Sequence, residues 1–416
     1  MNVGNIDKTN FTGYSARPLK GFFVVDKNMP ACKELIKLSS KTGLDIFTPQ
    51  IASKSVKKDY AAASSAKQLM WGQDYITFLR CKVSMFEGNR DFLKRIMNAT
   101  ANGAKSLGFT PFKPKDHLRG GNFFITDRNE LLLHEARANY TEDELKTVFG
   151  VDAIHIIPKL DYHLDLYLRP LKDNIILVAD EKSTKKMLEL GLAKTKEYIA
   201  NNNLSKEELE NFSKIDESFT SLIKCMEVTQ QFSPYKPLER TEEVINTLEN
   251  AGYRAIRVPA NYYLLEDFQD KNKLKEQIQD FNKHINHLNK LKEVLPEEKQ
   301  IYWQGFIDLT IQDANKKKDR ACCEFVHKYK NNFSNAIVTE KDGELVYITN
   351  EALLDDEIGL TEDIINKIGF STKQYFMDSI KEFVKPENIH FISKDTTKEL
   401  FKYLGGIHCT GAEIPV

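Results

Sequence analysis

The chain has 416 residues, of which 41% are hydrophobic and 29% charged, and this length suits two domains or one large domain with insertions. Its 59 basic and 60 acidic side chains nearly cancel, so no charge imbalance favours nucleic acid or an anionic membrane as a partner, and neither is expected. The polar start MNVGNIDKTN and the lack of any run of about 20 apolar residues argue against a secretory signal and a membrane span.

The use of cysteine indicates a reducing compartment. No CxxC pair occurs, and six cysteines in so long a chain do not make a disulfide framework. We therefore expect a cytoplasmic protein, with export by a signal-less route left open. Cys322 and Cys323 lie near His327, but zinc normally takes four ligands and no second pair is close, so we expect no metal and no organic cofactor.

Short β-rich runs recur along the chain, each near a helical stretch. Several have a tight polar turn between two apolar halves, which is typical of strand–turn–strand units. The clearest runs are 21–26, 74–86, 122–135, 174–180 and 335–349. The unit that repeats is strand, turn, strand, helix, strand. This repeat predicts an α/β array with its helices outside and several strand ends near one centre, where loops commonly build sites.

The boundaries of two helices can be predicted within this array. Thr141 and Glu144 have the spacing of a capping box, which predicts a helix that ends near Gly150. Thr241 is similarly predicted to begin a helix that Gly252 ends.

Two Lys- and Glu-rich helical stretches interrupt the repeat, and we interpret them as insertions. The first contains a capping box at Ser205-x-x-Glu208. The second has an apolar stripe at helical spacing, which predicts either a helical hairpin packed on the body or a coiled coil that binds a partner protein. The stripe consists of Leu274, Ile278, Phe281, Ile285, Leu288, Leu291 and Leu295. The predicted segments are a catalytic unit at 1–190, an insertion at 191–235, catalytic chain at 236–262, an insertion at 263–328 and the last catalytic part at 329–416.

Four short motifs contain residue types that can perform chemistry. In chain order they are Trp71-Gly-Gln-Asp74, Gly120-Gly121-Asn122, His163-Leu-Asp165 and Gly406-Ile-His408-Cys409.

Each motif also has a purely structural interpretation. Asp74 would be an exposed carboxylate at a strand start, the glycine pair a turn, and Cys409 a thiol packed as a small hydrophobe. His163 and Asp165 share one face if they lie in a strand, as a buried polar pair would. In a strand His408 would point away from Cys409, so we expect it to be structural.

The positions of the motifs favour a shared site, because each falls at the boundary of a β-rich run, where the repeating units would converge. A thiol, a histidine and two carboxylates in one pocket have a definite use. Two carboxylates can each accept paired hydrogen bonds from a planar guanidinium, which has five N–H donors. A thiolate could then attack the guanidinium carbon.

In their order, WGQD, GGN, HLD and GGIHC resemble the motifs of the guanidino-group-modifying superfamily. This family contains arginine, agmatine and peptidylarginine deiminases and amidinotransferases. The resemblance covers most of the chain outside the two helical stretches, as a pattern of motifs. It implies the pentein fold, a five-fold pseudosymmetric α/β propeller, here with helical insertions.

By position, the resemblance implies a role for each motif residue. Cys409 matches the nucleophile, His163 the general acid and base, and Asp165 and Asp74 the carboxylates that hold the guanidinium. The further substrate-binding candidates are Trp71, Gly120, Gly121, Asn122, Arg119 and Arg169. Arg169 either pairs a substrate carboxylate or is a surface arginine before Pro170.

Arg119 departs from the family pattern. Many free-arginine and agmatine deiminases have a glutamate directly before the glycine pair, whereas the peptidylarginine branch does not. Deiminase chemistry therefore stays the prediction, with arginine, an arginine derivative or a protein arginine as substrate. The size of that substrate stays open, and the helical insertions could receive a protein partner.

The predicted reaction converts a guanidinium to a ureido group, as in citrulline, through an intermediate covalently bound to Cys409. Amidinotransfer, in which an amine replaces water, would use the same four residues. A non-catalytic binding scaffold is a second alternative, with the Arg119 cation in the guanidinium site. A cysteine protease is a third, and it needs the thiol and the histidine but not the two aspartates.

Overall fold

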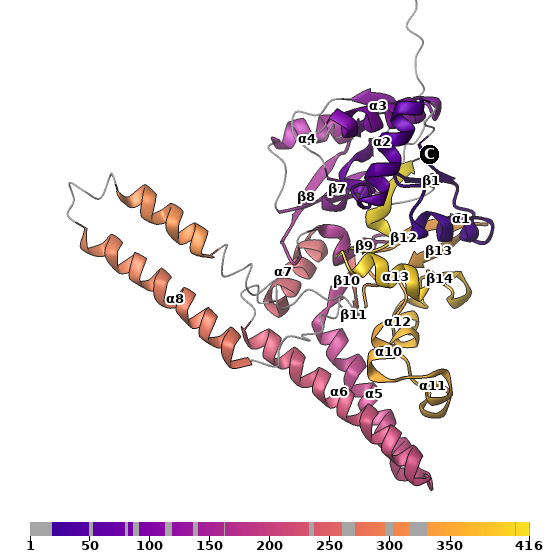
Figure 1. The fold of residues 1–416 in the computed structure, drawn as a ribbon, viewed down its shortest axis with the longest axis vertical. Coiled ribbons are helices and arrows are strands. Elements are labelled where there is room, and N and C mark those ends of the chain that lie inside the picture. The colour runs from indigo at the N-terminus through magenta and orange to yellow at the C-terminus, as the bar shows by residue number, and fades with distance from the viewer. Residues whose placement is uncertain are drawn as a thin grey trace, which may run out of the picture.

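The computed structural model describes residues 19–49, 53–79, 82–85, 91–112, 119–135, 140–161, 163–232, 237–259, 271–295, 303–315, 331–403 and 405–415. Cys322, Cys323 and His327 lie outside these residues. The described chain is a mixed α/β protein with many helices around small sheets (Figure 1). None of the helices within it is long and apolar enough to cross a membrane.

Five sheets of three strands share one topology. In each sheet the first two strands pair antiparallel, and the third runs parallel to the second. The sheets are β15 (Gly411–Pro415), β1 (Leu19–Val24) and β2 (Ile46–Phe47); β3 (Ile76–Leu79), β4 (Lys82–Met85) and β5 (Thr110–Phe112); β6 (Phe123–Ile125), β7 (Glu130–His134) and β8 (Ala153–Ile157); β9 (Leu168–Pro170), β10 (Ile175–Asp180) and β11 (Arg254–Pro259); β12 (Ile337–Lys341), β13 (Glu344–Thr349) and β14 (Ile389–Phe391). Five copies of one unit fit five-fold pseudosymmetry.

Helices join the parallel strands of each sheet, because a parallel pair needs a crossover connection. The crossovers are α1 (Pro30–Thr42), α3 (Asp91–Ser106) and α4 (Glu142–Phe149) in the first three sheets, α5 (Glu181–Asn201), α6 (Lys206–Phe232) and α7 (Pro237–Asn250) in the fourth, and α10 (Leu354–Ile358), α11 (Glu362–Ile368) and α12 (Thr372–Ile380) in the fifth. Two further helices, α2 (Lys54–Ser65) and α13 (Lys394–Phe401), connect successive sheets. The predicted repeat of strand, turn, strand, helix, strand is confirmed.

The caps bear out most of the predicted helix boundaries. Thr141 Oγ1 accepts a hydrogen bond from the Glu144 N–H at 3.2 Å, and Glu144 accepts one from the Thr141 N–H at 2.9 Å. Gly150 ends α4 with a φ of 68°, a conformation that glycine adopts without strain. The predicted start of α7 at Thr241 is wrong, because the helix already begins at Pro237. Proline is well suited to a first helical turn, where its missing N–H has no intrahelical partner.

The last strand of the chain completes the first sheet. β15 pairs antiparallel with β1, with Phe23 opposite Ala412. The residues before β15, which include Cys409, therefore occupy the same place in their unit as the residues before β3, β6, β9 and β12 do in theirs. This pairing explains why a thiol near the chain end lies at the centre of the molecule.

The first helical insertion packs on the body. Met187 of α5 and Phe219 of α6 lie in one buried cluster with Leu354 and Phe370, which belong to the α10–α12 segment. Gly191 permits this packing, since a Cβ there would lie 2.4 Å from the Phe219 ring.

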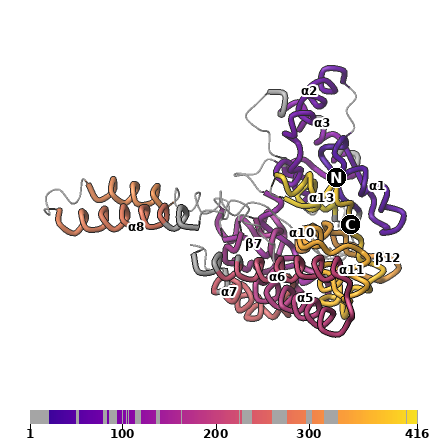
Figure 2. The backbone as a smooth tube through the Cα atoms, turned by 60° about the horizontal axis from the view of Figure 1, so that its bottom comes forward, coloured from indigo at the N-terminus to yellow at the C-terminus, as the bar shows by residue number. Residues whose placement is uncertain are grey.

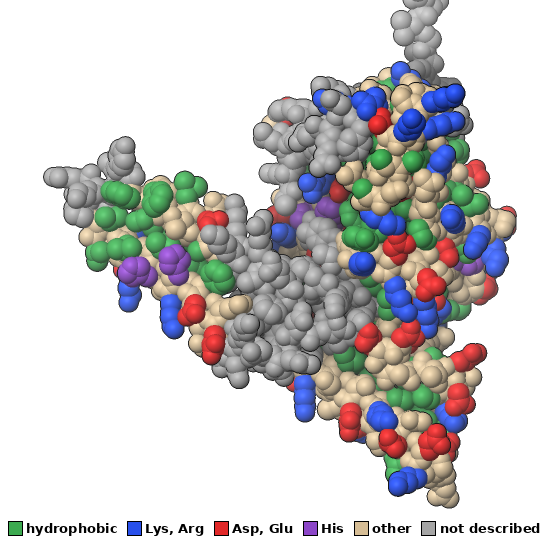
Figure 3. All heavy atoms as spheres, in the orientation of Figure 1, with side chains coloured by type: hydrophobic (Ala, Val, Ile, Leu, Met, Phe, Trp, Pro, Cys, Tyr) green, Lys and Arg blue, Asp and Glu red, His purple; other side chains and the backbone are tan. Residues whose placement is uncertain are grey.

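The second insertion is a helical hairpin that extends away from the sheets. α8 (Lys271–Val294) and the helix at 303–315 lie side by side in Figures 1 and 2. Leu288 and Ile307 are buried, and Lys292 pairs with Asp308 across the two helices at 2.7 Å. The predicted hairpin is confirmed, but the prediction that its stripe packs on the body is wrong, because the hairpin projects away from the sheets and Leu291 of the stripe is 39% exposed. Figure 3 shows hydrophobic side chains over this hairpin. The division of the chain into catalytic and inserted segments stays a prediction.

Candidate active site

The four motifs form four short 3₁₀ turns, and each turn directly precedes the first strand of a sheet. The turns are η1 (Gly72–Asp74) before β3, η2 (Gly120–Asn122) before β6, η3 (Leu164–Leu166) before β9 and η6 (His408–Thr410) before β15. η1 contacts both η2 and η6, and η2 contacts η3. The motif residues, far apart in sequence, therefore meet at one centre.

Two glycines allow this close approach. A Cβ on Gly72 would lie 2.2 Å from the Thr410 carbonyl oxygen, so η1 and η6 touch backbone to backbone. A Cβ on Gly121 would lie 2.7 Å from Gln73 Nε2, 2.8 Å from His163 Nδ1 and 3.1 Å from Asp165 Oδ1. Contacts shorter than about 3 Å are repulsive, so a larger residue would displace the backbone of η6 at position 72 and the surrounding side chains at position 121.

Cys409 and Asp165 are in direct contact. The Cys409 Sγ donates to Asp165 Oδ2 at 3.4 Å, and both side chains are buried. Asn335 joins them, because its Nδ2 donates to Asp165 Oδ2 at 2.9 Å and to Cys409 Sγ at 3.1 Å. The side chain of His163 is also buried and lies 3.5 Å from Gln73 Nε2 through its Nδ1.

Asn335 is a residue of the site that the motifs missed. It lies just before β12, which is the equivalent position in the fifth sheet, and its Oδ1 accepts from the His408 N–H at 2.8 Å. The signal that could have found it is the repeat itself. Four of the five units have a polar motif just before their first strand. The same position in the remaining unit, just before β12, is therefore also expected to contribute a site residue.

The prediction that His408 points away from the site is wrong. Its Nδ1 lies 2.8 Å from Asp165 Oδ2, and the side chain is 5% exposed. The prediction assumed strand alternation, whereas residues 408–410 form a 3₁₀ turn, in which neighbouring side chains do not alternate between two faces.

Arg169 is fully buried, so its interpretation as a surface arginine is wrong. It forms an ion pair with Glu413 of β15, and its guanidinium lies 5.1 Å from the centre of the Phe124 ring. Its Nε and Nη1 have no acceptor among the described residues. Binding of a substrate carboxylate by Arg169 stays a prediction.

Burial is the largest influence on the ionisation of the central groups. It raises the pKa of the Cys409 thiol, and the charge of Asp165 raises this pKa further, to well above its usual value. Burial also raises the pKa of Asp165, but the hydrogen bond and charge of His408 outweigh it, so this pKa is lowered overall. Burial lowers the pKa of His408, yet its bonds to Asp165 and Glu413 raise it on balance. These directions favour an ionised Asp165 paired with a protonated His408, beside a neutral thiol.

Four buried oxygen atoms from the motif turns have no hydrogen-bond donor among the described residues. They are Gln73 Oε1, Asp74 Oδ1, Asn122 Oδ1 and Asp165 Oδ1. Buried acceptors without donors are uncommon in folded proteins and call for a partner. All four are acceptors, so the partner they fit is rich in N–H or O–H groups.

The remaining candidates lie around this centre. A Cβ on Gly405 would lie 2.5 Å from the Trp71 ring, so the indole packs on the backbone that leads into η6. Arg119 is exposed, which does not fit the alternative in which its guanidinium occupies the buried centre. Gly120 lies over Gln73, with 3.1 Å between its ideal Cβ position and the Gln73 carbonyl oxygen.

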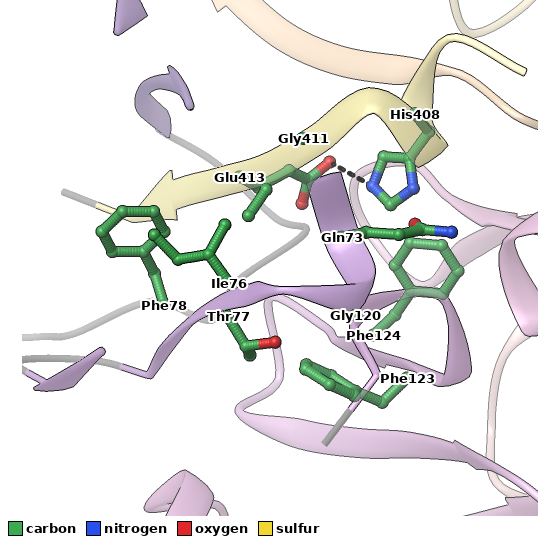
Figure 4. Close-up of a pocket in the computed structure, with 11 residues that line it drawn as sticks. Gln73, Ile76, Thr77, Phe78, Gly120, Phe123, Phe124, His408, Gly411 and Glu413 are labelled. Atoms are coloured by element: carbon green, nitrogen blue, oxygen red, sulfur yellow. Dashed lines mark ion pairs between the residues drawn. The ribbon is translucent and has the colours of Figure 1, made fainter. Parts of the chain in front are cut away.

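A pocket adjoins the cluster on the side of His408. Figure 4 shows His408 and Glu413 along the segment that ends in β15, facing Gln73 and Phe124 across the pocket. Phe123, Ile76 and Phe78 make its other walls largely apolar.

In the described part of the chain, no group of three or more His, Cys, Asp or Glu side chains is placed to hold a metal ion.

Comparisons with known proteins identify similar structures. No protein-family model and no curated protein matches the chain. An agmatine deiminase from C. jejuni is 10% identical with a TM-score of 0.49, over 99% of this chain and 99% of that one. The product-bound N-terminal domain of a cyanobacterial arginine dihydrolase is 10% identical with a TM-score of 0.40, over 96% of this chain and 98% of that one.

Proposed function

We propose that the chain is a deiminase built on a five-bladed α/β propeller. It would hydrolyse the guanidinium group of an arginine-type substrate to a ureido group and ammonia, through an intermediate bound to Cys409. The observation that carries this proposal is the contact of the buried Cys409 thiol with Asp165, together with four buried acceptor oxygens on motif turns that contact one another. A guanidinium is the complementary group, because it is planar and cationic and has five N–H donors and no acceptor.

The ionisation of the substrate-free centre suits a substrate-assisted mechanism. Burial and the charge of Asp165 raise the pKa of the Cys409 thiol, which favours the neutral thiol in the absence of substrate. A bound guanidinium, held by Asp165 and Asp74, would place a positive charge beside both groups. This charge lowers the free energy of the thiolate, so Cys409 ionises mainly when the substrate is present, with His163 accepting the proton.

The chemical steps then balance without a cofactor. The thiolate adds to the guanidinium carbon, and the bond from carbon to a terminal nitrogen breaks as His163 returns the proton, releasing ammonia. Water attacks the resulting amidino–sulfur cation and gives a proton to His163. The carbon–sulfur bond breaks, which leaves a ureido product and regenerates Cys409. The sum is one water consumed and one ammonium released for each guanidinium.

The experiment incubates the protein separately with arginine, agmatine and an arginine-containing peptide. We expect ammonia release and a mass increase of about one dalton in at least one substrate, because, between forms of equal charge, an =NH group is replaced by an oxygen atom. A Cys409→Ala variant, which removes the nucleophile, should release no ammonia under the same conditions.

The same assay separates the alternatives. Amidinotransfer would yield no ammonia but would transfer the amidino group to an added amine such as glycine or lysine. Absence of both reactions with all three substrates would contradict the proposal and favour a binding scaffold. Activity that persists in Cys409→Ala would refute the covalent mechanism.

A further inference from the structure

A buried chain of alternating charges lies behind Asp165. Asp165 Oδ2 is 2.8 Å from His408 Nδ1, and His408 Nε2 is 3.6 Å from Glu413 Oε1. Glu413 in turn pairs with Arg169. None of these side chains is more than 9% exposed, so negative and positive groups alternate from the candidate site into the core.

Stability alone does not account for such a chain. Removing four charged groups from water carries a large desolvation penalty, and apolar replacements for buried ion pairs are often neutral or stabilising. This row of charged side chains also reaches the candidate site, because Asp165 at its outer end contacts the Cys409 thiol. These features point to a role for the chain in the state of Asp165.

We propose that His408, held by Glu413 and Arg169, is a positioning residue that keeps Asp165 ionised and turns one of its two oxygens toward the substrate. This inference rests on the proposed function, because the substrate is the guanidinium group proposed above. His408 acts through Asp165 and does not itself touch the reacting atoms.

The two oxygens of Asp165 have different surroundings. Oδ2 accepts from His408, Asn335 and Cys409, at distances of 2.8, 2.9 and 3.4 Å. Oδ1 has no donor among the described residues and faces the space left by the absent side chain of Gly121. The bonds on Oδ2 therefore fix the carboxylate so that Oδ1 remains available for a ligand.

The groups that face this ion pair can be named on every side. The centroid of the His408 ring lies 6.2 Å from that of Phe22 and 5.7 Å from that of Phe124. Among the described residues its charged bonding partners are Asp165 and Glu413, and Glu413 pairs with Arg169. Asp165 faces His408, Asn335 and Cys409, and the titratable His163 lies nearby, on the same side of Gly121 as Asp165 Oδ1. Within the described chain, His408 is thus the charged group bonded directly to Asp165.

The test that needs no turnover is an infrared titration of the full chain. The carbonyl band of a protonated Asp165 is identified by its loss in Asp165→Asn. In the wild type we expect no such band down to about pH 4, where an ordinary aspartate is already about half protonated. In His408→Asn, whose amide nitrogen can replace Nδ1 as a donor without the charge, we expect the band to appear at least about one pH unit higher than in the wild type. The inference would be overturned if this band appeared at the same pH in both proteins, or if Asp165 of the wild type protonated above pH 4.

The kinetic test separates positioning from simple packing. In His408→Asn the acid limb of kcat/KM should move up by at least about one pH unit, because a protonated Asp165 binds the cation poorly. His408→Ala removes the hydrogen bond as well, so kcat at the pH optimum should fall by about tenfold or more. The matched control is Phe22→Leu, which removes packing from the same imidazole but keeps its bonds. It should lower the midpoint of thermal unfolding and leave the acid limb in place, and a shifted limb would contradict the positioning role.

The two proposals can fail separately. If the wild type acts on no guanidinium substrate but the infrared titrations differ as expected, the proposed function fails and the control of Asp165 by His408 stands. If turnover occurs and the titrations are the same, the positioning role fails and the deiminase proposal stands. If His408→Asn does not fold, the wild-type titration alone still decides whether Asp165 stays ionised.

Discussion

Replacement of Asp165 by asparagine is the most direct perturbation of the candidate site. The side chain is fully buried and accepts from His408, Asn335 and Cys409, so the substitution keeps the size of the group and removes its charge. In the proposed complex the substrate cation would lose one of its two carboxylate partners. Its buried charge would be only half compensated.

The expected loss follows from the energetics of buried ion pairs. Breaking a buried pair by removing one partner costs about 3–5 kcal/mol, because the other charge stays buried. With about 1.4 kcal/mol per factor of ten, Asp165→Asn should lower kcat/KM by roughly 10²- to 10⁴-fold. The fall should appear in both KM and kcat, since the carboxylate holds the guanidinium in the ground state and in the transition state.

The assay is ammonia release at several substrate concentrations, with circular dichroism to verify folding. Asp355→Asn is the matched control, because Asp355 is also a buried carboxylate, in α10, and accepts from the Thr372 N–H at 2.8 Å. It should lower thermal stability and change kcat/KM by less than about threefold, as expected outside the site. A folded Asp165→Asn protein that keeps kcat/KM within tenfold of the wild type would refute the assignment of Asp165 as a guanidinium ligand.

Two further predictions concern the same centre. Gly121→Ala should lower kcat/KM by at least about tenfold, because its Cβ would lie within 2.8 Å of His163 Nδ1 and shift the imidazole. Gly305→Ala, where an added Cβ meets nothing within 4 Å, should stay fully active and melt slightly higher, and equal activity of the two variants would contradict the tight packing at Gly121. Burial and the charge of Asp165 raise the pKa of Cys409. The rate at which iodoacetamide alkylates this thiol in the substrate-free protein should therefore still increase with pH at pH 9. Peptide mass spectrometry measures this rate, and a plateau below pH 8 would show that the free enzyme already holds a thiolate.

The sequence contained enough local information to predict the repeating unit. Thr141, Glu144 and Gly150 define a helix through contacts within a few residues of one another, so their pattern can be read without knowing the rest of the fold. Hairpin turns and apolar runs are equally local. The start of α7 was placed too late because the capping signal at Thr241 lies inside a helix that Pro237 already begins.

The sequence predicts only part of the candidate site. Asp165 and Cys409 were chosen because each falls at the boundary of a β-rich run, and the structure brings them into contact. Their roles in catalysis stay predictions. His408 was misinterpreted because the alternation rule holds for strands, and Asn335 was missed because an asparagine before a strand is also an ordinary turn residue.

The sequence by itself determined the elements, their repetition and the position of the motifs before the first strands. Each of these depends on hydrophobic period, caps and turns, which act over a few residues. Only the tertiary structure decided that β15 completes the first sheet, that Arg169 pairs with Glu413 although 244 positions separate them, and that the hairpin of α8 projects away from the sheets. Such contacts depend on how distant segments share one buried space, and the chemistry of a single side chain does not specify its distant partner.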